Sequence, residues 1–563
     1  MRGESVINRL PTALAILLAS LAIAAPAYAG DPIMPLSQVH RGMHCTGYSV
    51  IQGTDISSFD VDVIDVTEDG ILINASGPAV DQTGIGEGFS GSPIYCKDSQ
   101  GVARNIGAIA AGIGDYGNHK ALATPIEQML SQPVTPPARR VAKSRLAARA
   151  RPLLAPLTIS GITTPMQQRV LAAARRVGRA VITSPPPADA IFPPQTLRPG
   201  SSLGVGLSSG DIAVSAIGTV TYTDGSSVWG FGHPLDAFGA RSLLLQDAYV
   251  YDVINNPVGS EGLTSYKYAA PGHNLGTLTN DTITAVVGKV GDLPPLIQLA
   301  AHVRDLDTGA SKETNVQITD ELGLDLPPSL DLVAPIAVGD GAFNVLGSAP
   351  FDQSGTLCFS ITVRERKAPL RFCNRYAGAA VDLMIDDVSR AIILVDGFTI
   401  QQFHHLHVLR VDADEGVARG LHQGLIVGAT APRRVVPGRR ISVKLRLRLP
   451  HGPLQTVTVR PRVPAGLARG RAVMTVQGTR ADGEPSGAFD ESLGLPASDL
   501  PSGPKTLKQL AARVAAIHRF HGVTVSFTPP GRKAKALRVR LFPSTSDPLL
   551  RISGKLSRRV AVR

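Results

Sequence analysis

Short segments of alternating apolar and polar residues limit the possible folds of this chain more than any other feature. They occupy residues 48–51, 59–66, 70–74, 92–96 and 105–111, and turns rich in Gly, Asp and Ser separate them. A two-residue alternation is typical of strands that are buried on one face. A second series of such segments lies between residues 205 and 288. The sequence therefore predicts at least two β-units in a mainly β protein.

The chain has 563 residues, which is enough for several domains. A Pro-, Ala- and Arg-rich stretch beginning at residue 133 marks a boundary, and a helical period covers residues 164–179. A second helix is expected near residues 379–394. We expect a division into residues 30–132, a connector with a helix at 133–199, a second β-unit at 200–298, a β-rich domain with a helix at 299–430, and a C-terminal β domain with a basic tail at 431–563.

The N-terminus has the three parts of a secretory signal peptide. Arg2 and Arg9 precede an apolar run at residues 13–25, and a small-x-small site, AYA, ends at Ala29. The run is shorter than the ~20 residues that a membrane-spanning helix needs, so a retained anchor is the less favoured interpretation. We expect residues 1–29 to be removed and the protein to be periplasmic or extracellular.

The formal net charge of +11 is concentrated in two segments. Residues 128–188 contain ten Arg or Lys and no acid, residues 531–563 contain ten against one Asp, and the rest of the chain carries −8. No aromatic residue lies among the basic residues of the connector to stack on bases, so nucleic acid is not expected as a partner. The basic segments could instead contact an anionic envelope surface.

The four cysteines allow three disulfide pairings. Cys358 and Cys373 flank a predicted hairpin, which favours a bond between them and leaves Cys45 to pair with Cys96. Four free thiols are the alternative. No cysteine has the spacing of a metal site. His404, His405 and His407 lie on a predicted strand, where His405 and His407 share one face, but no third ligand at a recognisable spacing accompanies that pair. We therefore expect no metal and no cofactor.

The densest glycine turn, GIGEGFSGSP at residues 84–93, places Ser90 directly before a strand. Glycines permit the positive-φ backbone that presents a hydroxyl outward and directs N–H groups at one point. Ser90 is thus a candidate nucleophile, with the N–H groups of Gly88 and Ser90 as oxyanion donors. Taken alone, the same string could be an ordinary β-turn.

The segments around this turn resemble the SpoIVB-type serine peptidase family. The resemblance includes, in order, GTDI at 53–56, FDVDV at 59–63, SGPAVDQTG at 76–84, IGAI at 106–109 and ATPIEQML at 123–130. In that family this half of the peptidase domain bears the serine, which implies that Ser90 is the nucleophile. A serine nucleophile also needs a general base, usually histidine.

A later region is similar to the family's histidine-bearing half. Its segments are IGTVTY at 217–222, WGFGHPL at 229–235, GTLTND at 276–281 and VVG at 286–288, which implies His233 as the base. The sporulation protein has the two halves in the opposite order. The resemblance therefore implies a permuted, chymotrypsin-like double β-barrel, followed here by a β-rich, sandwich-like extension, with the active site between the barrels.

A serine peptidase of this kind also has a third catalytic residue, an acid that orients the histidine, and its identity in this chain is undecided. The family has Asp-Pro shortly before the serine, whereas residues 76–78 here read Ser-Gly-Pro. Asp81 lies nearby and is our first candidate, and Asp236, three residues after His233, is the second. The resemblance implies an exported serine endopeptidase that cleaves a protein or peptide substrate. The alternative is a peptidase-like binding or scaffold protein of the envelope without turnover.

Overall fold

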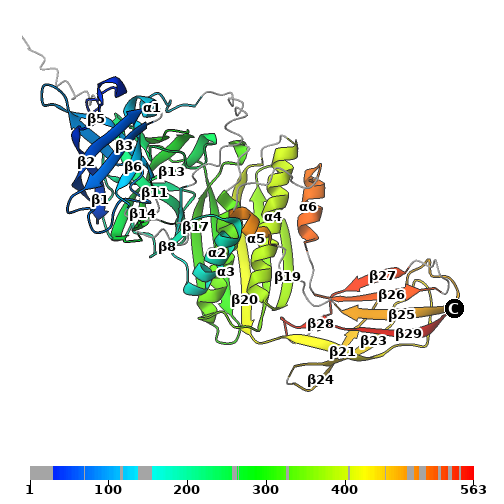
Figure 1. Ribbon diagram of the computed structural model, residues 1–563. Coiled ribbons are helices and arrows are strands. Elements are labelled where there is room, and N and C mark those ends of the chain that lie inside the picture. Colours follow the sequence, from blue (N-terminus) through cyan, green and yellow to red (C-terminus); the bar gives the residue numbers. More distant parts are fainter. Residues whose placement is uncertain are drawn as a thin grey trace, which may run out of the picture.

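The computed structural model describes residues 30–68, 70–113, 118–136, 155–256, 263, 265–324, 329–402, 406–450, 452–478, 487–493, 503–517, 521–529, 536–543 and 547–563. The predicted signal peptide lies outside these residues, as does residue range 137–154 of the connector. Strands make up 50% and helices 16%, which confirms the mainly β fold. Figure 1 shows an elongated molecule with a barrel at one end and a two-sheet sandwich at the other.

Six antiparallel strands close the first barrel in the order β1-β2-β3-β6-β5-β4. Alternate residues such as Val61, Val63 and Ile73 point into it and are buried, which explains the two-residue period of the sequence. A short 3-10 helix, η1 (Leu36–Gln38), precedes the barrel, and α1 (Ile126–Leu130) follows it. The strands are β1 (His44–Gln52), β2 (Asp55–Thr67), β3 (Gly70–Ser76), β4 (Pro93–Lys97), β5 (Ala103–Gly112) and β6 (Lys120–Pro125).

The second barrel lies within an eight-stranded sheet. Its antiparallel pairs run β9-β11-β12-β15-β14-β13 and return to β9, so six strands form a closed ring. These strands are β9 (Ser202–Gly206), β11 (Ala213–Asp224), β12 (Ser227–Gly230), β13 (Gly239–Ile254), β14 (Tyr266–Asp281) and β15 (Val286–Val290). Numbered from one to six within each unit, both rings pair as 1-2-3-6-5-4. The molecule therefore contains one barrel topology twice.

The connector region adds two strands and a helix to the second barrel. β7 (Leu157–Ser160) pairs with β11, and β8 (Val181–Ser184) pairs with β7. Between them runs α2 (Thr164–Val177), where the sequence predicts a helix. Gly178 ends α2 with a φ of 69°, a conformation that glycine adopts without strain.

A six-stranded sheet in the order β10-β17-β16-β20-β18-β19 forms the third unit. The helices pack on it through a large apolar core that also includes residues of α2. The strands are β10 (Ser208–Gly210), β16 (Leu296–Asp305), β17 (Ser311–Thr319), β18 (Gln353–Val363), β19 (Leu370–Gly378) and β20 (Val408–Arg419). The helical segments are η3 (Leu322–Leu324), α3 (Ser329–Leu346), α4 (Ala380–Gln402), α5 (Ala488–Leu493) and α6 (Leu507–Ala515).

The expected single helix of this unit is α4, and the sequence analysis missed α3. Apolar residues surround α3 on every side, so no amphipathic stripe marks it, and Pro335 lies within it. By length and composition α3 could cross a membrane, but 83% of its apolar window is buried inside the fold, so this is weak evidence for a span.

The C-terminal unit is a sandwich of two sheets around its own apolar core. One sheet has the order β24-β23-β21-β28, and the other has the order β22-β29-β25-β26-β27. The basic C-terminal segment contributes three strands to this sandwich, β27, β28 and β29. The strands are β21 (Gln423–Thr430), β22 (Arg434–Val435), β23 (Val443–Arg448), β24 (Leu454–Val459), β25 (Gly470–Gly478), β26 (Val523–Thr528), β27 (Leu537–Leu541), β28 (Arg551–Ser553) and β29 (Lys555–Val562).

All four cysteines form disulfides, and both predicted pairings are confirmed. Cys45 and Cys96 lie opposite each other on β1 and β4 and complete the ring of the first barrel. Cys358 and Cys373 lie opposite each other on β18 and β19. Two disulfides are typical of a protein in an oxidising compartment.

Candidate functional site

The Ser90 loop lies between β3 and β4 and is held by both barrels. Gly91 has a φ of 92°, and a Cβ there would overlap the carbonyl oxygen of Thr219 on β11, so the position requires glycine. The N–H of Thr219 donates to the carbonyl of Ser90 over 2.8 Å, and the N–H of Gly91 donates to Ile109 on β5 over 2.7 Å. The backbone of the predicted nucleophile is therefore fixed at the junction of the two barrels.

Two N–H groups of this loop are unengaged. The N–H of Phe89 donates to Gly86 over 3.0 Å, but those of Gly88 and Ser90 donate to no atom of the residues that the structure describes. Gly88 has a φ of 91°, and its carbonyl accepts the hydroxyl of Thr219 over 3.0 Å. The two predicted oxyanion donors are thus available to an oxygen atom of a ligand.

His233 lies in the loop that follows β12 and is half-buried. Its Nδ1 lies 2.7 Å from the carbonyl oxygen of Pro234. A carbonyl can only accept, so Nδ1 carries the proton and Nε2 is the acceptor in the neutral ring. Burial lowers the pKa of His233 below its usual value, although the Pro234 carbonyl opposes that shift. This is the tautomer that a general base at Nε2 requires.

Strands β5 and β6 bring the two loops together. Gly91 donates to Ile109 on β5, while Thr124 on β6 donates its hydroxyl to the carbonyl of Gly232 over 2.6 Å. A Cβ on Gly232 would lie 3.0 Å from the same Ile109 oxygen. The immediate neighbours of Ser90 and His233 therefore flank one carbonyl group. The Ser90 and His233 side chains form no hydrogen bond with each other in the described structure, so their roles stay predictions.

Neither candidate acid contacts the imidazole ring, within the described ranges. The carboxylate of Asp81 accepts the N–H of Gly77 over 2.7 Å and closes an exposed turn. The carboxylate of Asp236 lies 3.2 Å from Arg241 and 3.5 Å from Arg179. The partner of His233 Nδ1 is a backbone carbonyl, which orients the ring without a third side chain.

A carboxylate that was not singled out as a candidate, Asp281, holds the His233 loop from beneath. It is fully buried at the end of β14 and accepts the N–H groups of Leu235 over 2.7 Å and Asp236 over 2.8 Å. Burial raises the pKa of Asp281 to about 6, and Arg241, 3.5 Å away, opposes that shift. The sequence signal that could have identified Asp281 is the Asn-Asp pair at the end of the GTLTND segment, but the sequence analysis used that segment only as evidence of the family resemblance.

Arg241 links this carboxylate to the third unit of the protein. Its guanidinium forms two hydrogen bonds of 2.9 Å with Glu321, and both side chains are buried. The guanidinium also faces Asp236 and Asp281. Charged groups can be buried in this way only when they are paired, so the cluster fixes one arrangement of the loop.

Lys267 was also missed, and it lies beneath the Ser90 loop. It is 2% exposed and donates from Nζ to the hydroxyls of Ser49 over 2.8 Å and Thr219 over 3.1 Å. Its Nζ also lies 4.9 Å from the centre of the Phe89 ring. Ser92 donates to Ser49 over 3.0 Å, which extends the network. In the sequence, Lys267 stands in an alternating strand between Tyr266 and Tyr268, and nothing in that pattern indicates that it is buried.

This lysine has no carboxylate partner in the described residues, and burial lowers its pKa to about 7. The hydroxyl of Thr219 accepts from Lys267 and donates to the carbonyl of Gly88. Lys267 is therefore joined through one hydroxyl to the residue that bears an oxyanion donor. Glu87, next in the loop, has its pKa raised to about 6 by burial.

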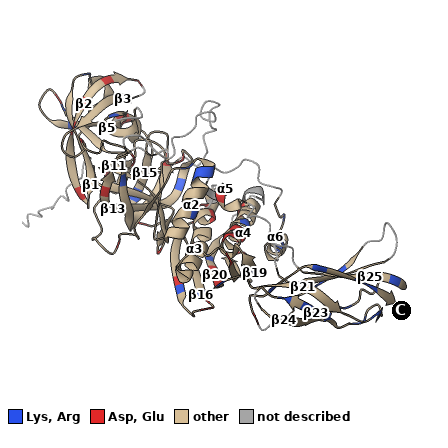
Figure 2. Cartoon of the chain, turned by 60° about the horizontal axis from the view of Figure 1, so that its bottom comes forward, with Lys and Arg blue, Asp and Glu red and all other residues tan. Residues whose placement is uncertain are grey.

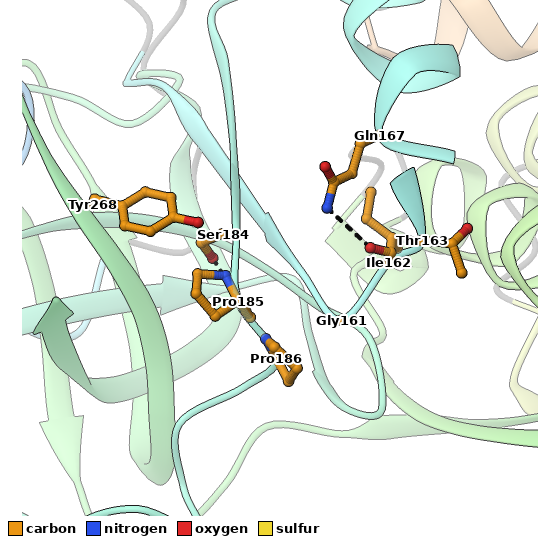
Figure 3. Close-up of a pocket in the computed structure, with 8 residues that line it drawn as sticks. All are labelled: Gly161, Ile162, Thr163, Gln167, Ser184, Pro185, Pro186 and Tyr268. Atoms are coloured by element: carbon orange, nitrogen blue, oxygen red, sulfur yellow. Dashed lines mark hydrogen bonds between the residues drawn. The ribbon is translucent and has the colours of Figure 1, made fainter. Parts of the chain in front are cut away.

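Two other features have no part in this arrangement. One is a pocket of about 270 Å³, whose lining contains no acidic, basic or histidine side chain. Figure 3 shows its lining residues, which are Gly161, Ile162, Thr163, Gln167, Ser184, Pro185, Pro186 and Tyr268. Of the histidine cluster, His404 and His405 lie outside the described residues, and His407 pairs with Glu365 over 2.6 Å.

Searches against protein families, curated proteins and solved structures found no match to this chain.

Proposed function

We propose that this protein is an exported serine endopeptidase that cleaves protein or peptide substrates through an acyl-enzyme. The carrying observation is the pair of unengaged N–H groups on Gly88 and Ser90, in a loop that adjoins a neutral, partly buried histidine. The two disulfides and the signal-like sequence of residues 1–29 support export.

In this mechanism Ser90 Oγ attacks the scissile carbonyl carbon while His233 Nε2 takes the hydroxyl proton. The carbonyl oxygen becomes an oxyanion that accepts the N–H groups of Gly88 and Ser90. His233 then gives its proton to the leaving amine, and the acyl group stays on Ser90. In the second half of the reaction, water attacks the acyl carbonyl in the same way and releases the carboxylic acid product from Ser90. The carbonyl of Pro234 holds the imidazole in the required tautomer.

One observation favours the second candidate, a peptidase-like binding protein of the envelope. No carboxylate contacts His233 in the described residues, and loss of that partner costs a triad orders of magnitude in turnover. Such a protein would keep the two barrels and bind its partner without cleaving it.

Labelling with a fluorophosphonate probe separates the two. The intact protein should take up one probe, located at Ser90 by peptide mass spectrometry, and Ser90→Ala should remove the label. Ser92→Ala is the matched control, because Ser92 is a neighbouring hydroxyl that is fully buried. No labelling of the folded protein would favour the binding protein, and labelling that survives Ser90→Ala would contradict the role of Ser90 as the nucleophile.

A further inference from the structure

The strands of the C-terminal sandwich contain no acidic residue. Strands β21 to β29 include neither Asp nor Glu. Figure 2 accordingly shows blue segments but no red ones along these strands. The same strands carry eleven basic residues, which are Arg434, Lys444, Arg446, Arg448, Arg471, Arg538, Arg540, Arg551, Lys555, Arg558 and Arg559.

The outer face of the five-stranded sheet has cations at its sides and hydroxyls between them. Arg538 on β27 lies opposite Ser526, which lies opposite Thr475, which lies opposite Ser557. Lys555 and Arg559 flank Ser557 on β29, and Arg471 is the second residue of β25. Adjacent strands are about 4.8 Å apart, so this face spans roughly 14 Å from β27 to β29.

The cations of this face are not neutralised by the residues that the structure describes. Arg471, Arg538, Lys555 and Arg559 are exposed, and none of them forms an ion pair with a residue that the structure describes. Like charges on one face repel each other and reduce stability. Their unpaired state favours a partner that supplies the negative charge.

The outer face of the other sheet is basic as well. Lys444, Arg446 and Arg448 alternate along β23 with buried residues, and the guanidinium of Arg446 lies directly over Gly428 of β21. Threonines on β24 lie opposite Lys444 and Arg446. Cations therefore project from both outer faces of the sandwich.

We infer that this sandwich binds a flexible, phosphate-bearing polymer of the envelope that lacks bases. A flat membrane could touch only one of two opposite faces at a time, whereas a flexible chain can follow both. Ser526 can donate to a phosphate oxygen, and so can one of Thr475 and Ser557, whose hydroxyls share a hydrogen bond of 2.8 Å. The strand positions of both outer faces contain no aromatic residue on which bases could stack, and the exposed Phe542, directly after β27, already has the guanidinium of Arg540 over its ring. Counterion release from the polymer makes such binding strongly dependent on salt.

The test uses the full chain and fluorescently labelled inorganic polyphosphate of long chain length, followed by anisotropy at several salt concentrations. Replacement of Arg471, Arg538, Lys555 and Arg559 by Gln should weaken binding by about a thousandfold, since each of the four surface cations contributes on the order of 1 kcal/mol and every ~1.4 kcal/mol is a tenfold change in affinity. It should also make the salt dependence less steep. Replacement of Lys444, Arg446 and Arg448 by Gln should weaken it separately.

The matched control replaces four exposed cations elsewhere, Arg41, Lys97, Lys289 and Arg371, by Gln, which changes the net charge equally. It should leave the affinity within about threefold. Equal losses in both four-site variants would overturn the proposal. Tighter binding to a single-stranded oligonucleotide, or to phosphatidylglycerol vesicles than to polyphosphate, would also overturn it in favour of those partners. This proposal does not depend on peptidase activity, because the binding test does not involve Ser90.

Discussion

The two barrels share one strand order but hold their functional loops by different means. The first positions Ser90 through positive-φ glycines and backbone hydrogen bonds, and a disulfide closes its ring next to that loop. The second has no cysteine and positions the His233 loop through a buried carboxylate and a buried guanidinium. Its long strands, β13 and β14, shift register at four points. The same strand order therefore supports a loop in two ways. The first barrel uses glycine conformations and a disulfide, and the second uses buried charged side chains.

Each barrel also braces the loop of the other. Thr219 and Thr221 of the second barrel donate their hydroxyls to the carbonyls of Gly88 and Gly91. Thr124 of the first barrel donates to Gly232 beside His233. Separation of the barrels would therefore release both loops, and the three predictions below test the two kinds of support.

The largest effect is expected for Lys267→Met, measured as the pH dependence of the free energy of unfolding. The pKa of Lys267 is lowered to about 7 in the folded protein from 10.5 in the unfolded chain. The unfolded state binds the extra proton between these values, so wild-type stability rises with pH across that window and is constant below it. Relative to the variant, the rise should total about 4–5 kcal/mol.

The measurement is urea unfolding of both proteins from pH 6 to 10, where the difference between them removes the contribution of other titrating groups. Lys289→Met, at an exposed lysine, is the control and should match the wild type. An equal slope for Lys267→Met and wild type would show that Lys267 is not buried as a titrating amine.

The next effect is expected for Asp281→Ala, which leaves the N–H groups of Leu235, Asp236 and Phe238 without their carboxylate acceptor and removes one of the three carboxylates that surround Arg241. Removal of one partner of a buried pair costs about 3–4 kcal/mol. Chemical denaturation measures this loss, and Asp224→Ala, at an exposed carboxylate, is the control. A loss below that of the control would mean that the second barrel does not depend on buried charge.

The smallest of the three is expected for the double variant Cys45→Ser with Cys96→Ser. The disulfide closes a loop with a sequence separation of 51 residues, and its removal should destabilise the first barrel by about 3 kcal/mol. Thermal unfolding under oxidising conditions measures the effect. The pair Cys358 and Cys373, with a separation of 15, should cost less on the same entropic argument. The reverse order would contradict a role for the disulfide as the covalent support of the first barrel.

Local signals in the sequence were sufficient for the β-units, the Ser90 turn and the disulfides. Alternation reports which face of a strand is buried, and Cys358 and Cys373 flank a hairpin whose two strands place them opposite each other. The buried network was not accessible in this way. Lys267 occupies a strand position that resembles a surface position until the Ser90 loop of the other barrel covers it.

The acid position shows the same limit. Asp81 and Asp236 were chosen because they are near Ser90 and His233 in sequence, but the carboxylate beneath the His233 loop, Asp281, comes from a strand that ends 48 residues after His233. The shared strand order was also invisible, because the two rings are built from segments of different length and composition. Topology depends on which strands pair, and single segments do not encode that.

The carbonyl of Ile109 gives the two loops a common reference point. Gly91 is hydrogen-bonded to it, and Gly232 packs against it and is bonded to the adjoining strand. A thermal displacement of β5 and β6 as a unit therefore carries both loops in the same direction, and the separation of Ser90 from His233 changes little. The fluctuations of the two loops should therefore be correlated, although Ser90 and His233 are 143 positions apart in the chain.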